Sequence, residues 1–180
     1  MRVEIVDLTG DNIKDAPEFS AYPFSCKYCL YWECPEEFKD LERKGKETMT
    51  GKKLVWLQNT IDSFGNCGKI LRVDGEPVGY AQYAPHELLP NSASYSASPG
   101  DDAVLLSRLY IAQERCRYLM ARFLKTIVEE LKGRGIKAIE TFATKKNSFE
   151  TPSGPVEFYL RNGFRIHEDD KEWPLMRLDL

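Results

Sequence analysis

The feature that most constrains the fold is a long apolar strand that leads directly into an amphipathic helix. Residues 103–111 carry apolar side chains at most positions, which is typical of a strand buried on both faces. After a short basic turn, apolar residues recur at the spacing of one helical stripe. The members of this stripe are Leu119, Met120, Phe123, Leu124, Ile127, Val128 and Leu131. A well-buried strand that leads into such a helix indicates a sheet with helices covering it.

The remaining segments predict further strands and helices around this unit. Strands are expected at 3–8, 69–73, 78–84, 136–143, 164–167 and 175–178, and helices from about 35, at 48–64 and at 156–161. Turn residues at 74–77 indicate an antiparallel hairpin. Residues 86–102 are rich in Ser and Pro without apolar periodicity, so a loop without regular structure is expected. This order predicts an α+β fold in a single domain, residues 1–180, with a mixed central sheet flanked by helices.

Composition and charge argue against a nucleic-acid-binding, membrane or exported protein. The chain has 180 residues with 25 Lys and Arg and 28 Asp and Glu, so its formal net charge is -3. A balance this close to neutrality gives no general attraction to nucleic acid or to an anionic membrane, and neither is expected as a partner. No apolar run approaches the roughly 20 residues of a membrane-spanning helix. Residues 1–12 lack the pattern of a signal peptide. We therefore expect a soluble, cytoplasmic protein, with a homodimer among the open alternatives for its oligomeric state.

The cysteines form a second unusual feature. There are five of them, so they cannot all pair within the chain, and thiols are expected. Cys26, Cys29 and Cys34 fall close together, but a tetrahedral zinc site needs four ligands, and Cys67 or a distant histidine would have to complete it. No metal is therefore expected, and buried or redox-capable thiols are the alternative. Cys34 precedes Pro35, a predicted helix start, where a thiolate is favoured.

The turn after the buried strand is a candidate anion site. Arg115 and Arg117 lie at the predicted start of the amphipathic helix. Unpaired backbone N–H groups and the positive end of the helix dipole suit phosphate oxygens at such a place. The alternative is an ordinary strand-to-helix turn with solvated arginines.

A second segment, residues 154–164, carries a candidate proton donor. Pro155 is placed to begin a short helix, and Asn162-Gly163 is placed to end it in a left-handed cap. Between them lies Tyr159, whose phenol is able to donate a proton. The alternative is a packing residue with a satisfied hydroxyl group.

Together these two segments resemble the GNAT superfamily of acyl-CoA-dependent N-acetyltransferases. The strand, turn and helix resemble its coenzyme-binding motif, and Phe158-Tyr159-Leu160-Arg161-Asn162-Gly163-Phe164 resembles its aromatic–Tyr–x–x–x–Gly–Phe signature. Pro77-Val78-Gly79-Tyr80 and Pro174-Leu175-Met176-Arg177-Leu178 fit the same layout. The likeness covers residues 66–180, and the order of elements extends it over the chain. It implies a GNAT-type fold and an enzyme that transfers an acetyl group from acetyl-CoA to a primary amine of an unidentified acceptor.

The resemblance also implies roles for particular residues. Tyr159 would be the general acid that protonates the departing thiolate, and the main chain of Leu109, Tyr110 and Ile111 would pair with the pantetheine arm. The residues implied at the pyrophosphate are Arg115, Cys116, Arg117, Tyr118, Leu119 and Met120. Tyr118 and Met120 stand where the family usually has small residues. This departure keeps a non-catalytic acyl-CoA-binding or regulatory module as an alternative function, with a cysteine-based metal or thiol sensor as a third.

A general base is sought among the strand residues. Alternation places Glu140 on the face that it shares with Ala138 and Phe142. A carboxylate on a central strand is costly unless it is paired or functional, so Glu140 is the candidate base, acting directly or through water. A salt bridge is the alternative reading of Glu140. His86 and His167 are alternatives by residue type alone.

Overall fold

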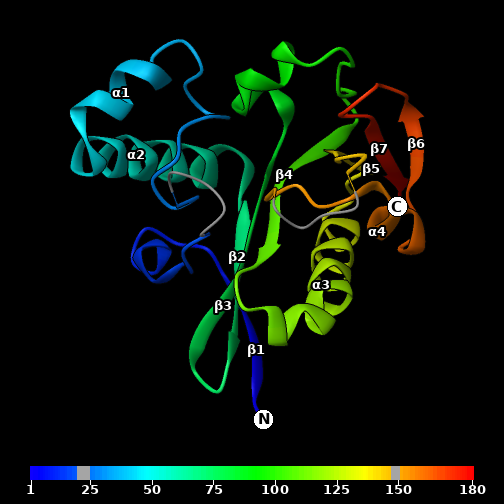
Figure 1. Ribbon diagram of the computed structural model, residues 1–180, viewed down its shortest axis with the longest axis horizontal. Coiled ribbons are helices and arrows are strands. Elements are labelled where there is room, and N and C mark those ends of the chain that lie inside the picture. The colour runs from blue at the N-terminus through cyan, green and yellow to red at the C-terminus, as the bar shows by residue number, and fades with distance from the viewer. Residues whose placement is uncertain (20–24, 147–150) are drawn as a thin grey trace.

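The computed structural model describes residues 1–19, 25–146 and 151–180 (Figure 1). The strands are β1 (Val3–Asp7), β2 (Gly68–Val73), β3 (Glu76–Ala84), β4 (Ala103–Ile111), β5 (Ala138–Phe142), β6 (Arg165–Glu168) and β7 (Leu175–Asp179). The α-helices are α1 (Phe38–Lys44), α2 (Lys46–Phe64), α3 (Met120–Gly133) and α4 (Val156–Arg161). Four short 3-10 helices are η1 (Ile13–Asp15), η2 (His86–Leu88), η3 (Pro90–Ser94) and η4 (Glu114–Leu119). Apart from these 3-10 turns, the order of strands and helices is the one that the sequence predicts.

The strands form one mixed sheet in the order β1-β2-β3-β4-β5-β7-β6. All neighbouring strands are antiparallel except β4 and β5, which run parallel. The β4–β5 pairing extends only from Ala103↔Ala138 to Leu105↔Glu140, and β4 continues beyond it without β5 as a partner. This mixed sheet with flanking helices is the α+β fold that the sequence predicts.

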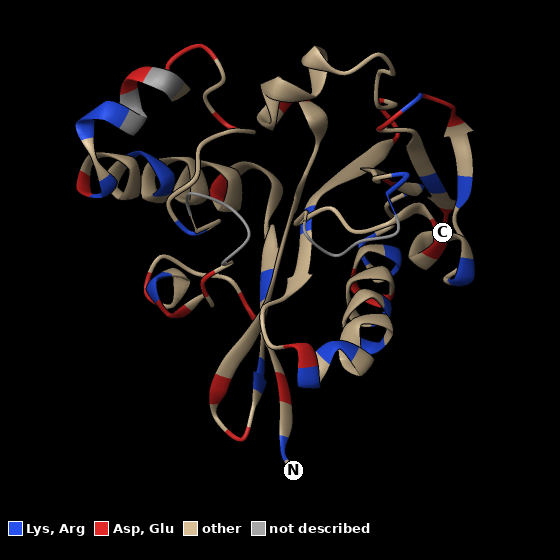
Figure 2. Cartoon of the chain, in the orientation of Figure 1, with Lys and Arg blue, Asp and Glu red and all other residues tan. Residues whose placement is uncertain are grey.

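Two helical layers cover the two faces of the sheet. Helices α3 and α4 pack on one face, where Phe123, Ile127 and Tyr159 join a core with side chains of β2 to β5. Helix α2 and the N-terminal segment pack on the other face, where Leu57 lies with Tyr80 and other residues of β2 to β4. Charged residues of both signs occur along α2 and α3 (Figure 2). Both layers bury apolar side chains of β4, as its apolar sequence requires.

The predicted hairpin forms with β2 and β3 as its strands. Asp74 and Gly75 both have positive φ, 51° and 86°, as a two-residue hairpin turn requires. At the other end of β2, a Cβ on Gly68 would lie 2.7 Å from the carbonyl oxygen of Ala81. Glycine therefore permits the close approach of these two strands at that position.

Two local expectations are wrong. Residues 35–37 form a turn, and α1 begins only at Phe38, so Cys34 does not lie at a helix N-terminus. Partial burial and then the carboxylates of Glu33 and Glu37 raise the pKa of the Cys34 thiol, so a thiolate is disfavoured there. The connection 86–102 is not without structure either, since it contains η2 and η3 and buries Leu89 in the core. Local periodicity did not reveal these turns, because their helices are too short to show a stripe.

Among the helices in the described part of the chain, none combines the length and apolar character that a bilayer crossing requires.

Candidate functional site

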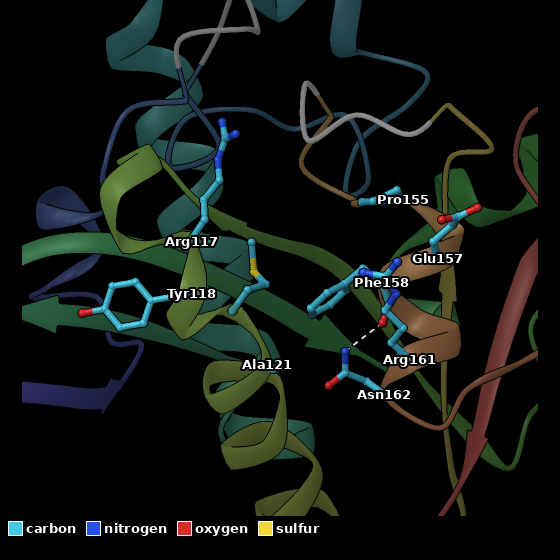
Figure 3. Close-up of a pocket in the computed structure, with 9 residues that line it drawn as sticks. Arg117, Tyr118, Ala121, Pro155, Glu157, Phe158, Arg161 and Asn162 are labelled. Carbon is cyan, nitrogen blue, oxygen red and sulfur yellow. Dashed lines mark hydrogen bonds between the residues drawn. The ribbon is translucent and has the colours of Figure 1, made fainter.

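A pocket of about 450 Å³ lies between the start of α3 and helix α4 (Figure 3). Its lining residues are Arg117, Tyr118, Met120, Ala121, Pro155, Glu157, Phe158, Arg161 and Asn162. Local residues end the short helix α4. The Asn162 side chain donates to the Phe158 carbonyl at 2.7 Å, and Gly163 follows with φ 88°. Two guanidinium groups and one carboxylate are thus held at the edge of a partly apolar hollow.

The residues predicted for the pyrophosphate divide into three groups. Arg117, Tyr118 and Met120 line the pocket. Cys116 and Leu119 instead lie buried in the core. Arg115 does not line the pocket, since it is exposed and forms an ion pair with Glu76 at 3.3 Å. The sequence analysis did not single out the α4 side of this pocket, although the family signature contains Arg161 and Asn162.

The turn that leads into α3 has the form of a 3-10 helix, η4. In such a helix each N–H donates to the carbonyl oxygen three residues earlier. The Cys116 N–H donates to the Gln113 carbonyl at 2.9 Å, and the Met120 N–H donates to the Arg117 carbonyl. These N–H groups therefore already have partners within the chain. Their binding of pyrophosphate stays a prediction, and it would require this turn to rearrange.

The N–H of Leu109 and the hydroxyl of Tyr159, which are predicted to contact the pantetheine arm and the thioester, also form hydrogen bonds within the chain. The Leu109 N–H donates to the Pro152 carbonyl at 2.7 Å. The Tyr159 hydroxyl donates to the neighbouring Ser153 carbonyl, also at 2.7 Å. Residues 151–154, which we call the plug segment, thus connect β4 to α4 beyond the paired part of β4 and β5. The structure brings Leu109 and Tyr159 together around this segment.

Tyr159 is completely buried, and its ring packs edge-to-face against Phe158 and Phe164. Burial raises the pKa of its phenol well above the ordinary value, so the group is protonated at neutral pH. The hydroxyl is therefore a proton donor in the described structure. Its role as a general acid stays a prediction.

The contacts of Glu140 are those of a strand residue in an ion pair. Its side chain is fully buried, and one carboxylate oxygen accepts from Arg177 at 2.8 Å while the other accepts from the Gly100 N–H at 2.8 Å. Arg177 also pairs with Asp102 at 2.7 Å, so this group ties the loop before β4 to β5 and β7. His167 Nε2 lies 4.0 Å from the Glu140 carboxylate. The role of Glu140 as a base remains a prediction.

A buried polar cluster on the α2 face was not found from the sequence. Lys53 contacts the carboxylate of Glu33, and its ammonium group also donates to Gln82 Oε1 at 2.6 Å. Nearby, Arg108 Nη2 donates to Cys29 Sγ at 3.2 Å. The available signal was Arg108 itself, a charged residue within an otherwise mostly apolar strand.

One group of side chains is placed to share a metal ion. Among residues 1–19, 25–146 and 151–180, the only such group is His86, Glu87 and Asp101, which is mostly exposed. Cys26, Cys29 and Cys34 do not belong to it, and the expectation that they hold no metal stays a prediction.

Solved structures match the whole chain, whereas no family model and no curated protein matches it. PaiA N-acetyltransferase from Thermoplasma acidophilum, solved in complex with coenzyme A, is 17% identical over 100% of both chains, with a TM-score of 0.59. Ribosomal-protein-alanine N-acetyltransferase from Brucella melitensis is 15% identical over 98% of this chain and 99% of that one, with a TM-score of 0.58. An aminoglycoside N-acetyltransferase is 15% identical over 99% and 97%, with a TM-score of 0.60.

Likeness at such low identity shows the fold. The chain has the fold of the GNAT N-acetyltransferases, as its sequence motifs imply.

Proposed function

We propose that the protein binds acetyl-CoA and transfers its acetyl group to a primary amine. The observation that carries this proposal is the position of Tyr159, buried and protonated in α4 where β4 extends beyond β5, within a fold of N-acetyltransferases. One structure of this fold was solved with coenzyme A. The pocket between α3 and α4 lies beside Tyr159, because Phe158 and its neighbours in α4 line it.

The nucleotide end of the coenzyme is assigned to this pocket. Arg117 and Arg161 stand on opposite sides of it, and planar guanidinium groups suit the paired oxygens of phosphate. Once the plug segment withdraws, the main chain of β4 at Leu109 offers an N–H to the pantetheine arm. The thioester would then lie near the hydroxyl of Tyr159.

The proposed reaction is direct attack of the amine nitrogen on the thioester carbonyl. The carbon–nitrogen bond forms, the carbon–sulfur bond breaks, and the coenzyme leaves as a thiol. Tyr159 gives its proton to the leaving sulfur, a role that suits a phenol whose pKa is raised by burial. Glu140 is proposed to take the proton of the amine, directly or through water, and would have to exchange a present partner to do so.

A second candidate function is that of a non-catalytic acyl-CoA-binding or regulatory module. The specific observation in its favour is that the plug segment already holds the Leu109 N–H and the Tyr159 hydroxyl. The bulky Tyr118 and Met120 at the pocket agree with a site of modest affinity. Turnover with any amine distinguishes the two candidates.

Two experiments test the proposal. A panel of primary amines is incubated with acetyl-CoA while free thiol is followed, and release above the rate without amine supports transfer. Thermal stability is measured with and without coenzyme A, since a ligand that binds the folded state raises the melting temperature. Arg161→Glu and Arg117→Glu should reduce this stabilisation, whereas Arg115→Glu, at an arginine paired with Glu76, is the matched control. If only Arg115→Glu reduced it, the coenzyme would bind outside the pocket.

A further inference from the structure

The two cysteines of the Cys26-x-x-Cys29 sequence lie on one hydrogen-bonded turn. The Ser25 carbonyl accepts from the N–H groups of Tyr28 at 3.0 Å and Cys29 at 3.1 Å, which closes the backbone of residues 25–29 into this turn. Side chains three residues apart on such a turn are neighbours. Both thiols are buried, with exposed fractions of 1% for Cys26 and 5% for Cys29. Cys29 is also among the groups that act on the pKa of the Cys26 thiol, so the two thiols are neighbours.

A buried guanidinium group is directed at one of these sulfur atoms. Arg108 is only 3% exposed and donates to Cys29 Sγ at 3.2 Å, while its Nε has no hydrogen-bond partner. An arginine side chain remains charged in proteins, so its burial is costly without an anion. Among the described residues, the Cys29 sulfur accepts a hydrogen bond from Arg108, and Cys26 and Glu33 also lie close enough to act on its charge.

The neighbouring charges do not remove the need for an anion. Lys53 is a second buried cation, and the carboxylate oxygen Oε1 of Glu33 accepts from both Lys53 and Gln82. Within the described residues of this cluster, two cations thus face one carboxylate. The Cys29 sulfur is the one that accepts a hydrogen bond from this excess of positive charge, whereas burial raises the pKa of the Cys26 thiol.

We propose that Cys26 and Cys29 form a redox-active pair, in which hydrogen peroxide oxidises the Cys29 sulfur that Arg108 contacts and Cys26 then resolves the product. The Cys29 sulfur attacks one peroxide oxygen and becomes a sulfenic acid, and the second oxygen takes up the proton that the thiol loses and leaves as water. The Cys26 thiol attacks the sulfenic sulfur, which forms the disulfide and releases a second water. Two thiols and one peroxide thus yield one disulfide and two waters.

This site is separate from the coenzyme pocket. The cysteine pair lies on the α2 face of the sheet, where Cys26 belongs to the core formed with Leu57 and Tyr80. The pocket lies on the α3 face. Redox chemistry at this pair is therefore expected whether or not the protein transfers acetyl groups.

The other cysteines provide controls within the same chain. Burial raises the pKa of Cys67 to about 12, so this thiol is expected to resist oxidation. Cys34 is more exposed than Cys29, but burial and neighbouring carboxylates raise its pKa. Exposure alone thus predicts oxidation of Cys34 first, whereas the proposal predicts oxidation of Cys29 first.

The experiment treats the folded, reduced protein with hydrogen peroxide, blocks the remaining thiols after unfolding and locates the modified peptides by mass spectrometry. We expect loss of two hydrogen masses from the peptide that contains Cys26 and Cys29. In Cys26→Ser, which removes the resolving thiol, dimedone should trap a sulfenic acid at Cys29. Oxidation of Cys34 before the pair, or a pair that stays reduced until unfolding, would overturn the proposal.

The role of Arg108 is tested through the rate. Arg108→Met should slow oxidation of Cys29 about 10-fold or more, since a cation beside the sulfur stabilises the negative charge with which it attacks. Because this variant removes a buried charge, its fold is checked by circular dichroism. An unchanged oxidation rate of Cys29 in folded Arg108→Met would refute the role of Arg108.

Discussion

Replacing Pro152 by glycine tests whether the plug segment competes with the coenzyme for β4. In the structure, the Pro152 carbonyl accepts from the Leu109 N–H at 2.7 Å, and the Ser153 carbonyl accepts from the Tyr159 hydroxyl at 2.7 Å. A hydrogen bond within a protein contributes about 0.5–1.5 kcal/mol net. The two bonds together therefore favour the closed position of the plug segment by about 1–3 kcal/mol.

Pro152→Gly keeps both carbonyl groups but makes the closed position less favourable. Glycine adds conformational freedom to the withdrawn segment, worth about 0.4–1 kcal/mol. The buried ring of Pro152 is also lost, at about 0.8 kcal/mol for each methylene group that the ring had buried. A combined effect of about 1–3 kcal/mol corresponds to a gain of about 5- to 150-fold in affinity for coenzyme A, provided that the closed position dominates in the free protein.

Isothermal titration calorimetry with coenzyme A measures this gain. Pro90→Gly is the matched control, because Pro90 is an exposed residue at the start of η3 and lies outside the plug segment. The nucleotide half of coenzyme A, without pantetheine, should bind wild type and Pro152→Gly equally. Equal affinities of the folded wild type and Pro152→Gly for the complete coenzyme would refute the competition.

Three further predictions concern catalysis, the buried ion pair and acid stability. Tyr159→Phe should lower turnover about 10²–10⁴-fold if the phenol is the acid, with coenzyme binding retained in calorimetry; full turnover would make Tyr159 a packing residue. Lys53→Met leaves the buried carboxylate of Glu33 without its cation and should cost about 3–5 kcal/mol in urea unfolding, and adding Glu33→Gln should recover part of this loss. The N–H groups of Trp173 and then Glu172 lower the pKa of Asp170 from 3.8 to about 2, so the carboxylate stabilises the fold above pH 4 and this contribution disappears as the pH falls through 2. The melting temperature should fall less steeply between pH 4 and 2 in Asp170→Asn than in the wild type. An equal fall in the two proteins would contradict the assignment.

The strands and long helices were predictable because their signals are local. The bounds of β4 and α4 coincide with those expected from apolar runs and from the Pro155 and Asn162-Gly163 signals. The turn into α3 was less accessible, because Leu119 and Met120 fit a helical stripe whether the backbone forms a 3-10 or an α-helix. Periodicity reveals which side chains share a face, but it does not reveal which N–H groups remain unpaired.

The candidate site was predictable only in part, because several of its contacts join distant residues. Tyr159 and Arg117 were identified from local motifs, and the structure places them on neighbouring elements. The bond between Leu109 and Pro152 spans more than forty residues, and the contact between Arg108 and Cys29 spans 79. No local pattern encodes such pairs. They follow from the arrangement of the sheet, which brings the plug segment to the edge of β4 that β5 leaves unpaired and the N-terminal segment to the α2 face.

The short parallel pairing of β4 and β5 has a consequence for how the molecule opens. These two strands share only the pairs from Ala103↔Ala138 to Leu105↔Glu140, so the sheet consists of two ladders, β1–β4 and β5–β7, joined by a narrow seam and by the core beneath α3. Cooperative units of this kind exchange their amide hydrogens through separate openings. Amides of β5 and β7 are thus expected to exchange before those of β2 and β3 in the unliganded protein. A molecule bound across the β4–β5 seam would slow amide exchange in β5 and β7 by holding the two ladders together. Amide exchange therefore detects ligand binding at this seam even when the acceptor is not known.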